Sequence, residues 1–94
     1  MASSTPVVLI TGAAHRLGAH TARHLHQRGW NLVIHYRSRE ADANALRDEL
    51  NNIRQESAVA IQADLAAPDQ TELLARKAVS TWGRLDGLVN NASV

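Results

Sequence analysis

The sequence predicts an α/β fold, in which a parallel sheet is covered by helices on its faces. Four short apolar runs alternate with three longer segments whose apolar residues recur at helical spacing. The first apolar run leads directly into a glycine-containing turn and then into the first helical segment. Strands joined through helices must run parallel, because right-handed crossovers return the chain to the same end of the sheet.

The first two strands and the helix between them have clear limits. Residues 7–10 are a continuous run of Val, Leu and Ile, as expected of a strand covered on both faces. Residues 16–28 predict a helix that ends at Gly29, and residues 31–36 predict the second strand. The apolar face of this helix is expected to comprise Leu17, Thr21, Ala22 and Leu25.

The pattern then repeats. Residues 40–54 predict a second helix and residues 58–63 a third strand. A third helix is expected over residues 68–82, because proline suits a first helical turn, and a fourth strand over residues 85–89. The apolar stripes of these two helices are expected to be Ala43, Leu46, Leu50 and Ile53, and Leu73, Leu74, Ala78 and Val79.

Alternating strands and helices of this kind favour a Rossmann-like, doubly wound sheet with the strand order 3-2-1-4. No covering helix follows the fourth strand, so one sheet edge and parts of both faces would lie bare. We therefore expect residues 1–94 to form the first half of a larger single domain.

Composition excludes several classes of protein. The 94 residues are 45% hydrophobic and 20% charged, as in ordinary globular domains. The absence of cysteine excludes disulfides and thiolate metal sites, and favours a reducing, cytoplasmic setting. No apolar run approaches the ~18 residues of a membrane span, and the first residues lack the features of a signal peptide. A net charge of +1 and 3% aromatic residues give no basis for binding nucleic acid or membranes.

The turn over residues 11–18 reads Thr-Gly-Ala-Ala-His-Arg-Leu-Gly. Gly12 permits a sharp turn from strand to helix, and Gly18 allows the helix to pack close to the sheet. The first backbone N–H groups of the helix would then point, with the helix dipole, at a phosphate. Ala19 stands where a Walker A loop would need lysine. The alternative is an ordinary turn in a domain that binds nothing.

The second strand ends in basic rather than acidic residues. Domains that bind NAD carry an acidic side chain here to hold the ribose 2′-hydroxyl. This chain has Arg37, Ser38 and Arg39 instead, a set that suits a 2′-phosphate, because guanidinium groups bind phosphate through paired hydrogen bonds. The alternative is a solvated loop in which Glu40 and Asp42 pair with the arginines.

Three motifs together resemble the short-chain dehydrogenase/reductase family: the glycine turn, Asp64-Leu65 after the third strand, and Asn90-Asn91-Ala92 after the fourth. More narrowly, the chain is similar to the pteridine reductases. They share Arg16 in place of a glycine, a similar stretch at residues 35–38, and Ser93 where most relatives have glycine.

The resemblance implies a site for NADPH. The residues it assigns to cofactor binding are Gly12, Arg16, Leu17, Gly18, Tyr36, Arg37, Ser38, Arg39, Asp64, Leu65, Asn91, Ala92 and Ser93. The glycine turn would hold the pyrophosphate, and residues 36–39 the 2′-phosphate. Asp64 would meet the adenine amino group with Leu65 against the ring, unless Asp64 only caps the backbone. Arg16 and Ser93 would also lie beside the substrate.

The resemblance also implies hydride transfer from NADPH to a small substrate, with a pterin such as dihydrobiopterin or dihydrofolate as the leading candidate. The family's catalytic Tyr-x-x-x-Lys pair is missing here, since the single tyrosine, Tyr36, and the single lysine, Lys77, are 41 positions apart. We therefore expect catalytic residues in the second half of the fold and a homo-oligomer when that half is present. The alternatives are another carbonyl reductase or a non-catalytic module that senses dinucleotides.

The histidines do not predict a metal site. His20 and His24 are one helical turn apart, but no third ligand is evident and both are expected on the solvated face. His35, at the end of the second strand, is expected to be packed or adjacent to the cofactor.

Overall fold

The computed structural model describes residues 4–91. Its strands are β1 (Val7–Thr11), β2 (Asn31–Tyr36), β3 (Ala58–Gln62) and β4 (Gly87–Asn90). Its helices are α1 (Arg16–Gln27), α2 (Glu40–Ile53) and α3 (Pro68–Trp82). Every predicted element is present, and the limits differ by a residue or two. The largest difference is at β4, which begins at Gly87 rather than at residue 85.

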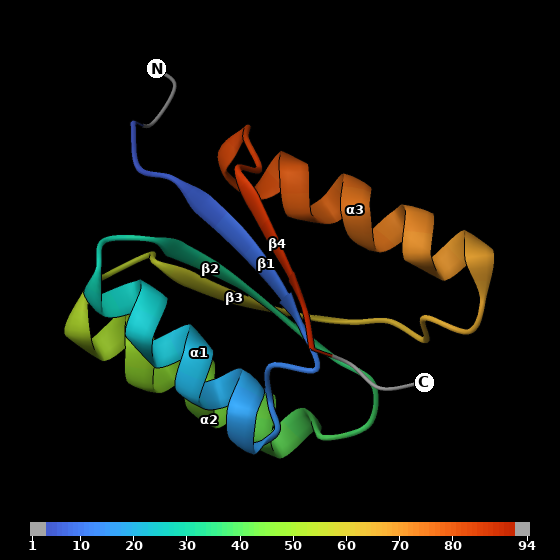
Figure 1. Cartoon of the computed structure of the whole chain (residues 1–94), viewed down its shortest axis with the longest axis horizontal. Coiled ribbons are helices and arrows are strands. Elements are labelled where there is room, and N and C mark those ends of the chain that lie inside the picture. Colours follow the sequence, from blue (N-terminus) through green and yellow to red (C-terminus); the bar gives the residue numbers. More distant parts are fainter. Residues whose placement is uncertain (1–3, 92–94) are drawn as a thin grey trace.

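The strands form one parallel sheet in the order β3-β2-β1-β4, which confirms the predicted Rossmann-like arrangement (Figure 1). Leu9 of β1 lies opposite Val33 of β2 on one side and Leu88 of β4 on the other. After β1 the chain continues to β2 and β3 on one side of β1. It then returns through α3 to β4 on the other side, so the strand order reverses at β1. In open α/β sheets this switch point is where ligands bind, just beyond the carboxyl ends of the strands.

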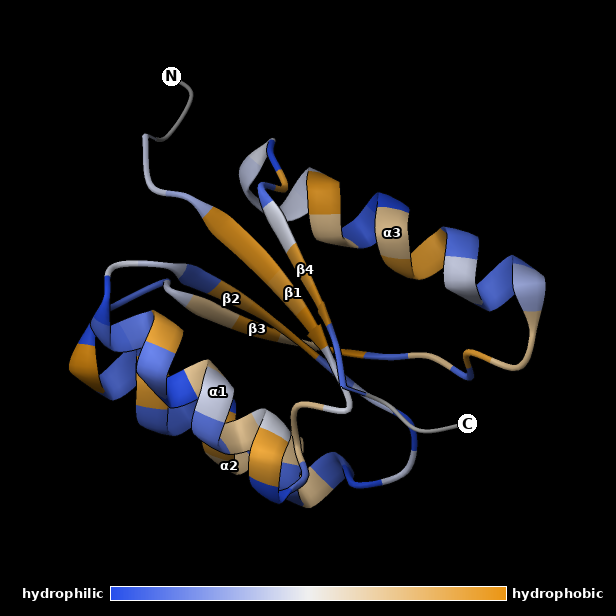
Figure 2. Ribbon diagram, viewed as in Figure 1, coloured by the Kyte–Doolittle hydropathy of each residue, from blue (hydrophilic) through white to orange (hydrophobic). Residues whose placement is uncertain are grey.

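Helices cover both faces of the sheet. Figure 1 shows α1 and α2 on one face and α3 on the other. Alternate residues of β1 divide between the two layers: Val8 and Ile10 pack toward α1 and α2, and Val7 and Leu9 pack into the cluster with α3. β1 and β2 are buried on both faces, which explains why they are largely apolar, as Figure 2 shows by their orange colour, whereas Leu88 of β4 is 63% exposed.

The predicted helix faces are right in their centres and wrong at their ends. In α1 the buried residues are Gly18, Ala19, Ala22 and His26, whereas Leu17 is 73% exposed. Small residues form this face because the glycine turn brings the helix axis close to the sheet, leaving no room for leucine. Ile53 is 70% exposed at the last residue of α2, where the chain leaves the helix. In α3, Leu74 and Ala78 are buried, while Leu73 and Val79 are largely exposed.

A network of polar side chains closes the amino end of the sheet. His26 is 1% exposed, and its Nε2 lies 2.7 Å from the hydroxyl of Ser57. Arg54 donates to the carbonyl oxygens of His26 and Trp30 at 3.1 and 2.7 Å. Asn51 accepts from the backbone N–H groups of Ser57 and residue 58, both at 2.9 Å. These bonds tie the ends of α1 and α2 to the starts of β2 and β3.

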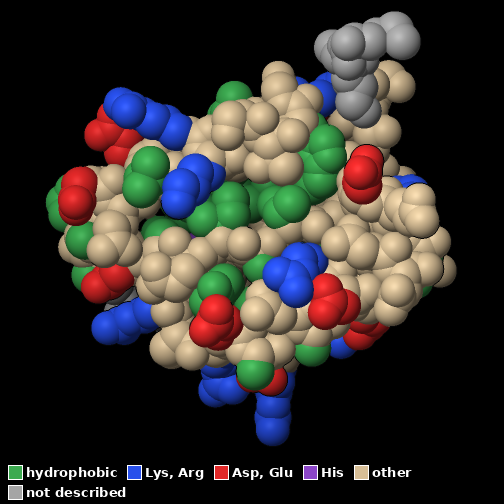
Figure 3. All heavy atoms as spheres, turned by 180° about the vertical axis from the view of Figure 1, so that it is seen from behind, with side chains coloured by type: hydrophobic (Ala, Val, Ile, Leu, Met, Phe, Trp, Pro, Cys, Tyr) green, Lys and Arg blue, Asp and Glu red, His purple; other side chains and the backbone are tan. Residues whose placement is uncertain are grey.

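The face opposite to the one seen in Figure 1 has a band of hydrophobic side chains across its middle, with charged groups around it (Figure 3). Among the partly buried members of the cluster under α3 are Val59, Ile61 and Trp82.

No helix within residues 4–91 has both the length and the apolar composition needed to cross a membrane.

Candidate functional site

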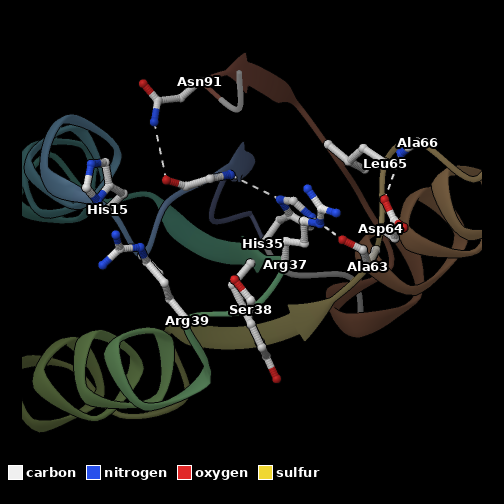
Figure 4. A pocket seen from close by; sticks show the side chains of 13 residues that line it. His15, His35, Arg37, Ser38, Arg39, Ala63, Asp64, Leu65, Ala66 and Asn91 are labelled. Atoms are coloured by element: carbon white, nitrogen blue, oxygen red, sulfur yellow. Dashed lines mark hydrogen bonds between the residues drawn. The ribbon is translucent and has the colours of Figure 1, made fainter. Parts of the chain in front are cut away.

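A hollow of about 230 Å³ lies at the carboxyl ends of the strands. Four loops build it, those that follow β1, β2, β3 and β4, and Figure 4 shows it from close by. It is lined by Gly12, Ala14, His15, His35, Tyr36, Arg37, Ser38, Arg39, Ala63, Asp64, Leu65, Ala66 and Asn91. The hollow thus stands at the switch point between β1 and its two neighbours.

The turn after β1 sets the direction of α1. Gly12 has a φ of 63°, a left-handed conformation that glycine adopts without strain. The first helical hydrogen bond joins the N–H of Ala19 to the carbonyl of His15 at 2.9 Å. The N–H groups of the first turn, from Arg16 to Gly18, precede that bond and have no acceptor within the helix. They are available to an anion at the positive end of the helix dipole.

Gly18 allows the closest approach between α1 and the sheet. A Cβ atom placed on it would lie 2.5 Å from the carbonyl oxygen of Gly12 and 2.7 Å from Nδ2 of Asn91. The same atom would lie 2.8 Å from the Cα of Ala13, and the backbone atoms of Gly12 and Ala13 cannot move freely. Only glycine fits here, which supports the predicted role of Gly18 in shaping the turn.

The loop after β4 is tied to the glycine turn. Thr11 Oγ1 donates to Oδ1 of Asn90 at 3.0 Å and accepts from the N–H of Asn91 at 3.0 Å. The side chain of Asn91 donates to the carbonyl of Gly12 at 3.3 Å. Asn91 therefore lines the hollow, and its role beside the cofactor stays a prediction. Ala92 and Ser93, the other two residues predicted in this loop, lie outside the described residues.

The loop after β2 brings two cations to the hollow. Arg37, Ser38 and Arg39 are exposed and line it together, and residues 36–39 include no acidic side chain. Arg39 forms an ion pair with Asp42 at 3.4 Å, as the solvated-loop alternative expected. Arg37 forms no ion pair with any acidic residue of the described chain. Gln62 donates to the carbonyl of Arg37 at 3.0 Å and so steadies the loop.

The loop after β3 forms the opposite wall. Figure 4 shows Asp64, Leu65 and Ala66 across the hollow from His15 and Arg39. Oδ1 of Asp64 accepts from the N–H of Ala66 at 3.0 Å, so the carboxylate does cap the backbone while it also lines the hollow. The N–H of Asp64 donates to Gln70 of α3 at 2.7 Å.

His35 lies between these loops. It is 2% exposed, which confirms that it is packed. Its Nδ1 lies 3.0 Å from the N–H nitrogen of Gly12, and its Nε2 lies 2.8 Å from the carbonyl oxygen of Ala63 (Figure 4).

Three of the predicted residues that the structure describes do not line the hollow. Arg16 and Leu17 are exposed in the first turn of α1 and do not line it, and Gly18 lies buried beneath the turn. Sequence reasoning missed four lining residues with small or unremarkable side chains, namely Ala14, His15, Ala63 and Ala66. It also missed Gln70, which accepts a hydrogen bond from the N–H of Asp64. A glutamine in the first turn of the helix that follows Asp64 could have indicated such a capping role.

The site offers no metal centre in the part of the chain that the structure describes, where no three potential ligands gather. His20 and His24 are both exposed, as predicted. The donor set instead consists of guanidinium groups, backbone N–H groups and a hydroxyl. These groups bind phosphate, and the glycine at position 18 allows α1 to pack close to the turn that presents its first N–H groups.

These features define a Rossmann-like α/β domain with a binding hollow at its switch point. The chain belongs to the short chain dehydrogenase family, which it matches over residues 6–94. Pteridine reductase 1 of Leishmania tarentolae is 39% identical over 107 aligned positions, covering 96% of this chain and 37% of that protein.

Other reductases are similar to a comparable degree. The 3-oxoacyl-(acyl-carrier-protein) reductase FabG of Staphylococcus aureus (strain N315) is 34% identical over 90 residues, covering 96% of this chain and 36% of that protein. A probable tetrahydroxynaphthalene reductase of Zymoseptoria tritici is 38% identical over 88 residues, covering 94% of this chain and 33% of that protein. The chain therefore spans about a third of the length of these relatives, which are oxidoreductases.

Proposed function

We propose that this chain forms the part of a short-chain reductase that binds the adenosine and phosphate end of NADPH. One observation carries the preference for NADPH: Arg37 and Arg39 both line the hollow at the end of β2, where NAD-binding domains have an acid. The family and the relatives, all named as reductases or dehydrogenases, support a nicotinamide cofactor in general.

In this proposal each loop holds one part of the cofactor. The N–H groups at the start of α1 bind the pyrophosphate, and Tyr36, Arg37, Ser38 and Arg39 surround the 2′-phosphate. Asp64 and Leu65 contact the adenine across the hollow. Asn91, with Ala92 and Ser93 after it, leads toward the nicotinamide. Leu17 shapes the turn from outside the hollow, and Arg16 reaches the pyrophosphate from its exposed position.

When bound, NADPH supplies a hydride to a small-molecule substrate. The residues of this chain bind and orient the cofactor, and none of them serves as the acid of the reaction. We place that acid, and the surfaces that form a homo-oligomer, in a second half of the fold. A cytoplasmic location is part of the same proposal and is supported by the absence of cysteine.

The finer proposal for the substrate is a pterin. It is supported by the stretch His35–Ser38, by Arg16 and Ser93 in place of glycines, and by the similarity to a pteridine reductase. A guanidinium at Arg16 retains N–H donors beyond those used by phosphate, and a pterin is rich in acceptors.

The decisive experiment measures NADPH and NADH dissociation constants for the complete reductase and for Arg37→Ala. Because Arg37 is exposed, we expect the low end of the range for a charge-assisted bond, a loss of about 1.5 kcal/mol or about tenfold in NADPH affinity. NADH has no 2′-phosphate, so its affinity should change little.

Arg28→Ala is the matched control, since it removes an exposed arginine from the far end of α1. It should leave both constants unchanged. An equal loss for both cofactors in Arg37→Ala would show that this side chain does not read the 2′-phosphate.

The same purified protein tests the substrate. Turnover of dihydrobiopterin or dihydrofolate with NADPH supports the pterin proposal. If only other carbonyl compounds were reduced, the protein would be a carbonyl reductase and not a pterin reductase. Cofactor binding without any turnover would favour a dinucleotide sensor.

A further inference from the structure

We propose that His35 is a positioning residue of the cofactor site: its imidazole, with the proton on Nε2, holds the glycine turn and the end of β3 at the separation the cofactor needs. This inference rests on the proposed function. It goes beyond it by assigning a role to a side chain that is buried and need not contact the phosphate itself.

The placement of His35 follows from the sheet order. β2 lies between β1 and β3, so a side chain at its carboxyl end can reach the exits of both neighbours. The ring does so, with Nδ1 3.0 Å from the nitrogen of Gly12 and Nε2 2.8 Å from the carbonyl oxygen of Ala63. The backbone adds to the same junction, because the N–H of Ala13 donates to the carbonyl of His35 at 3.0 Å.

The two partners fix the state of the ring. A backbone N–H can only donate, so Nδ1 must accept from Gly12. A carbonyl can only accept, so Nε2 must carry the hydrogen that goes to Ala63. Only the neutral Nε2–H tautomer satisfies both, and each partner would lose its bond if an apolar side chain filled the same space.

The bond to Gly12 matters because it completes the restraint on the two peptide groups that flank the Gly12 Cα. On the carbonyl side, the oxygen of Gly12 accepts from His15 N–H at 3.3 Å and from the Asn91 side chain at 3.3 Å. On the nitrogen side, His35 is the partner. These two peptide groups begin the turn that joins β1 to α1, so their orientation directs the N–H groups proposed to bind the pyrophosphate.

Three substitutions separate the two bonds. His35→Leu removes both. His35→Asn places an oxygen near the position of Nδ1 and can still accept from Gly12, whereas His35→Gln reaches the position of Nε2 and can still donate to Ala63. His26→Gln is the matched control, because His26 is equally buried but lies at the opposite end of the sheet.

The probe is adenosine 2′,5′-bisphosphate, titrated into the complete, folded reductase, with folding checked by circular dichroism. We expect His35→Leu to weaken binding by about tenfold, the worth of one lost hydrogen bond. His35→Asn should recover most of that affinity and His35→Gln much less, and His26→Gln should bind like the wild type. Equal affinities for the Asn and Gln variants, an unchanged affinity for the Leu variant, or an equal loss in His26→Gln would overturn the role.

The tautomer gives an independent reading that needs no variant. Nitrogen-15 NMR of the wild-type imidazole should show a protonated Nε2 and a bare Nδ1 at His35, and a protonated Nδ1 would overturn the assignment. If the wild type does not bind the bisphosphate at all, the proposed function fails, while the NMR result still decides whether His35 holds Gly12. The two ideas can therefore fail separately.

Discussion

The two ends of the sheet each bury a histidine, and the two rings have different partners. At the amino end, His26 lies 2.7 Å from the Ser57 hydroxyl, within a network that also contains Asn51 and Arg54. At the carboxyl end, the hydrogen-bond partners of the His35 ring within the described residues are backbone groups, and a hollow of about 230 Å³ lies beside it. At the amino end, polar side chains bond to one another and to the backbone, whereas at the carboxyl end the His35 side chain supports the backbone beside the hollow.

This difference indicates where stability and function should separate. Substitutions at the amino end should lower the free energy of unfolding and leave cofactor binding unchanged in the molecules that remain folded. Substitutions at the carboxyl end should affect binding more than their cost in stability suggests. Each of the following tests challenges that separation.

The largest effect is expected for Gly18→Ala. The added Cβ would meet the carbonyl oxygen of Gly12 at 2.5 Å and the Cα of Ala13 at 2.8 Å, so α1 must move away from the sheet. Overpacking against backbone costs about 3 kcal/mol, and the displaced helix should also lose its affinity for NADPH. Urea unfolding and cofactor titration measure the two effects.

Gly87→Ala is the control for Gly18→Ala. A Cβ there would lie 3.4 Å from the Trp30 ring, an ordinary contact, and we expect a change within about 0.5 kcal/mol. If Gly18→Ala changed the free energy of unfolding as little as this control, the close approach of α1 to the sheet would not be the reason that position 18 requires glycine.

The sequence predicted this end of the molecule well, because its signals are local. Gly12, Gly18 and the arginines after β2 are recognisable from their order along the chain, and strand order follows from alternation of elements. The orientation of Arg16 and Leu17 was not predictable in the same way. Leucine usually indicates the buried face of a helix. Here Gly18 allows α1 to approach the sheet so closely that alanines occupy the buried face.

The second prediction concerns the amino end, where Asn51→Ala removes three hydrogen bonds to the backbone. Its Oδ1 accepts from the N–H groups of Ser57 and Ala58, and its Nδ2 donates to the carbonyl of Ala58 at 3.0 Å. Leaving partly buried backbone groups without partners should lower the free energy of unfolding by about 2 kcal/mol. The dissociation constant for NADPH should not change.

Asn52→Ala, on the exposed side of α2, is the matched control and should have almost no effect on stability. If Asn51→Ala lost NADPH affinity under conditions in which the variant is fully folded, the two ends of the sheet would be coupled.

The amino-end network itself was invisible in the sequence. Asn51, Arg54 and Ser57 read as polar residues at a helix end, and His26 fell outside the predicted apolar face of α1. Their bonds join segments up to 31 residues apart, and such distant partners are set by how α1 and α2 pack, which no local pattern encodes. The same limit applies to His35, which was predicted to be packed or adjacent to the cofactor, but whose two backbone partners were not predicted.

The smallest effect is the pH dependence that His26 gives to stability. Burial, and then the positive charge of Arg54, hold the pKa of His26 below its usual value, although Glu49 opposes this shift. In the unfolded chain the pKa returns to about 6.5, so as pH falls below that value the unfolded state takes up a proton that the folded state does not. The free energy of unfolding should therefore be at its full value above pH ~6.5, fall as pH drops toward the lowered pKa, and then level off.

Unfolding curves for the wild type and His26→Gln between pH ~7.5 and ~5.5 isolate this contribution, because that window is set by the histidine pKa. The pKa values of Glu49 and Asp86 are lowered by hydrogen bonds from Arg23 and Arg84, so these carboxylates lose their stabilising effect only at more acidic pH. The wild-type slope should be the steeper one in this window, and NADPH affinity should stay equal in the two proteins at pH 7.5. Parallel slopes would show that some other group carries the dependence, and a lower affinity in the variant would mean that the buried histidine at the amino end also serves the site.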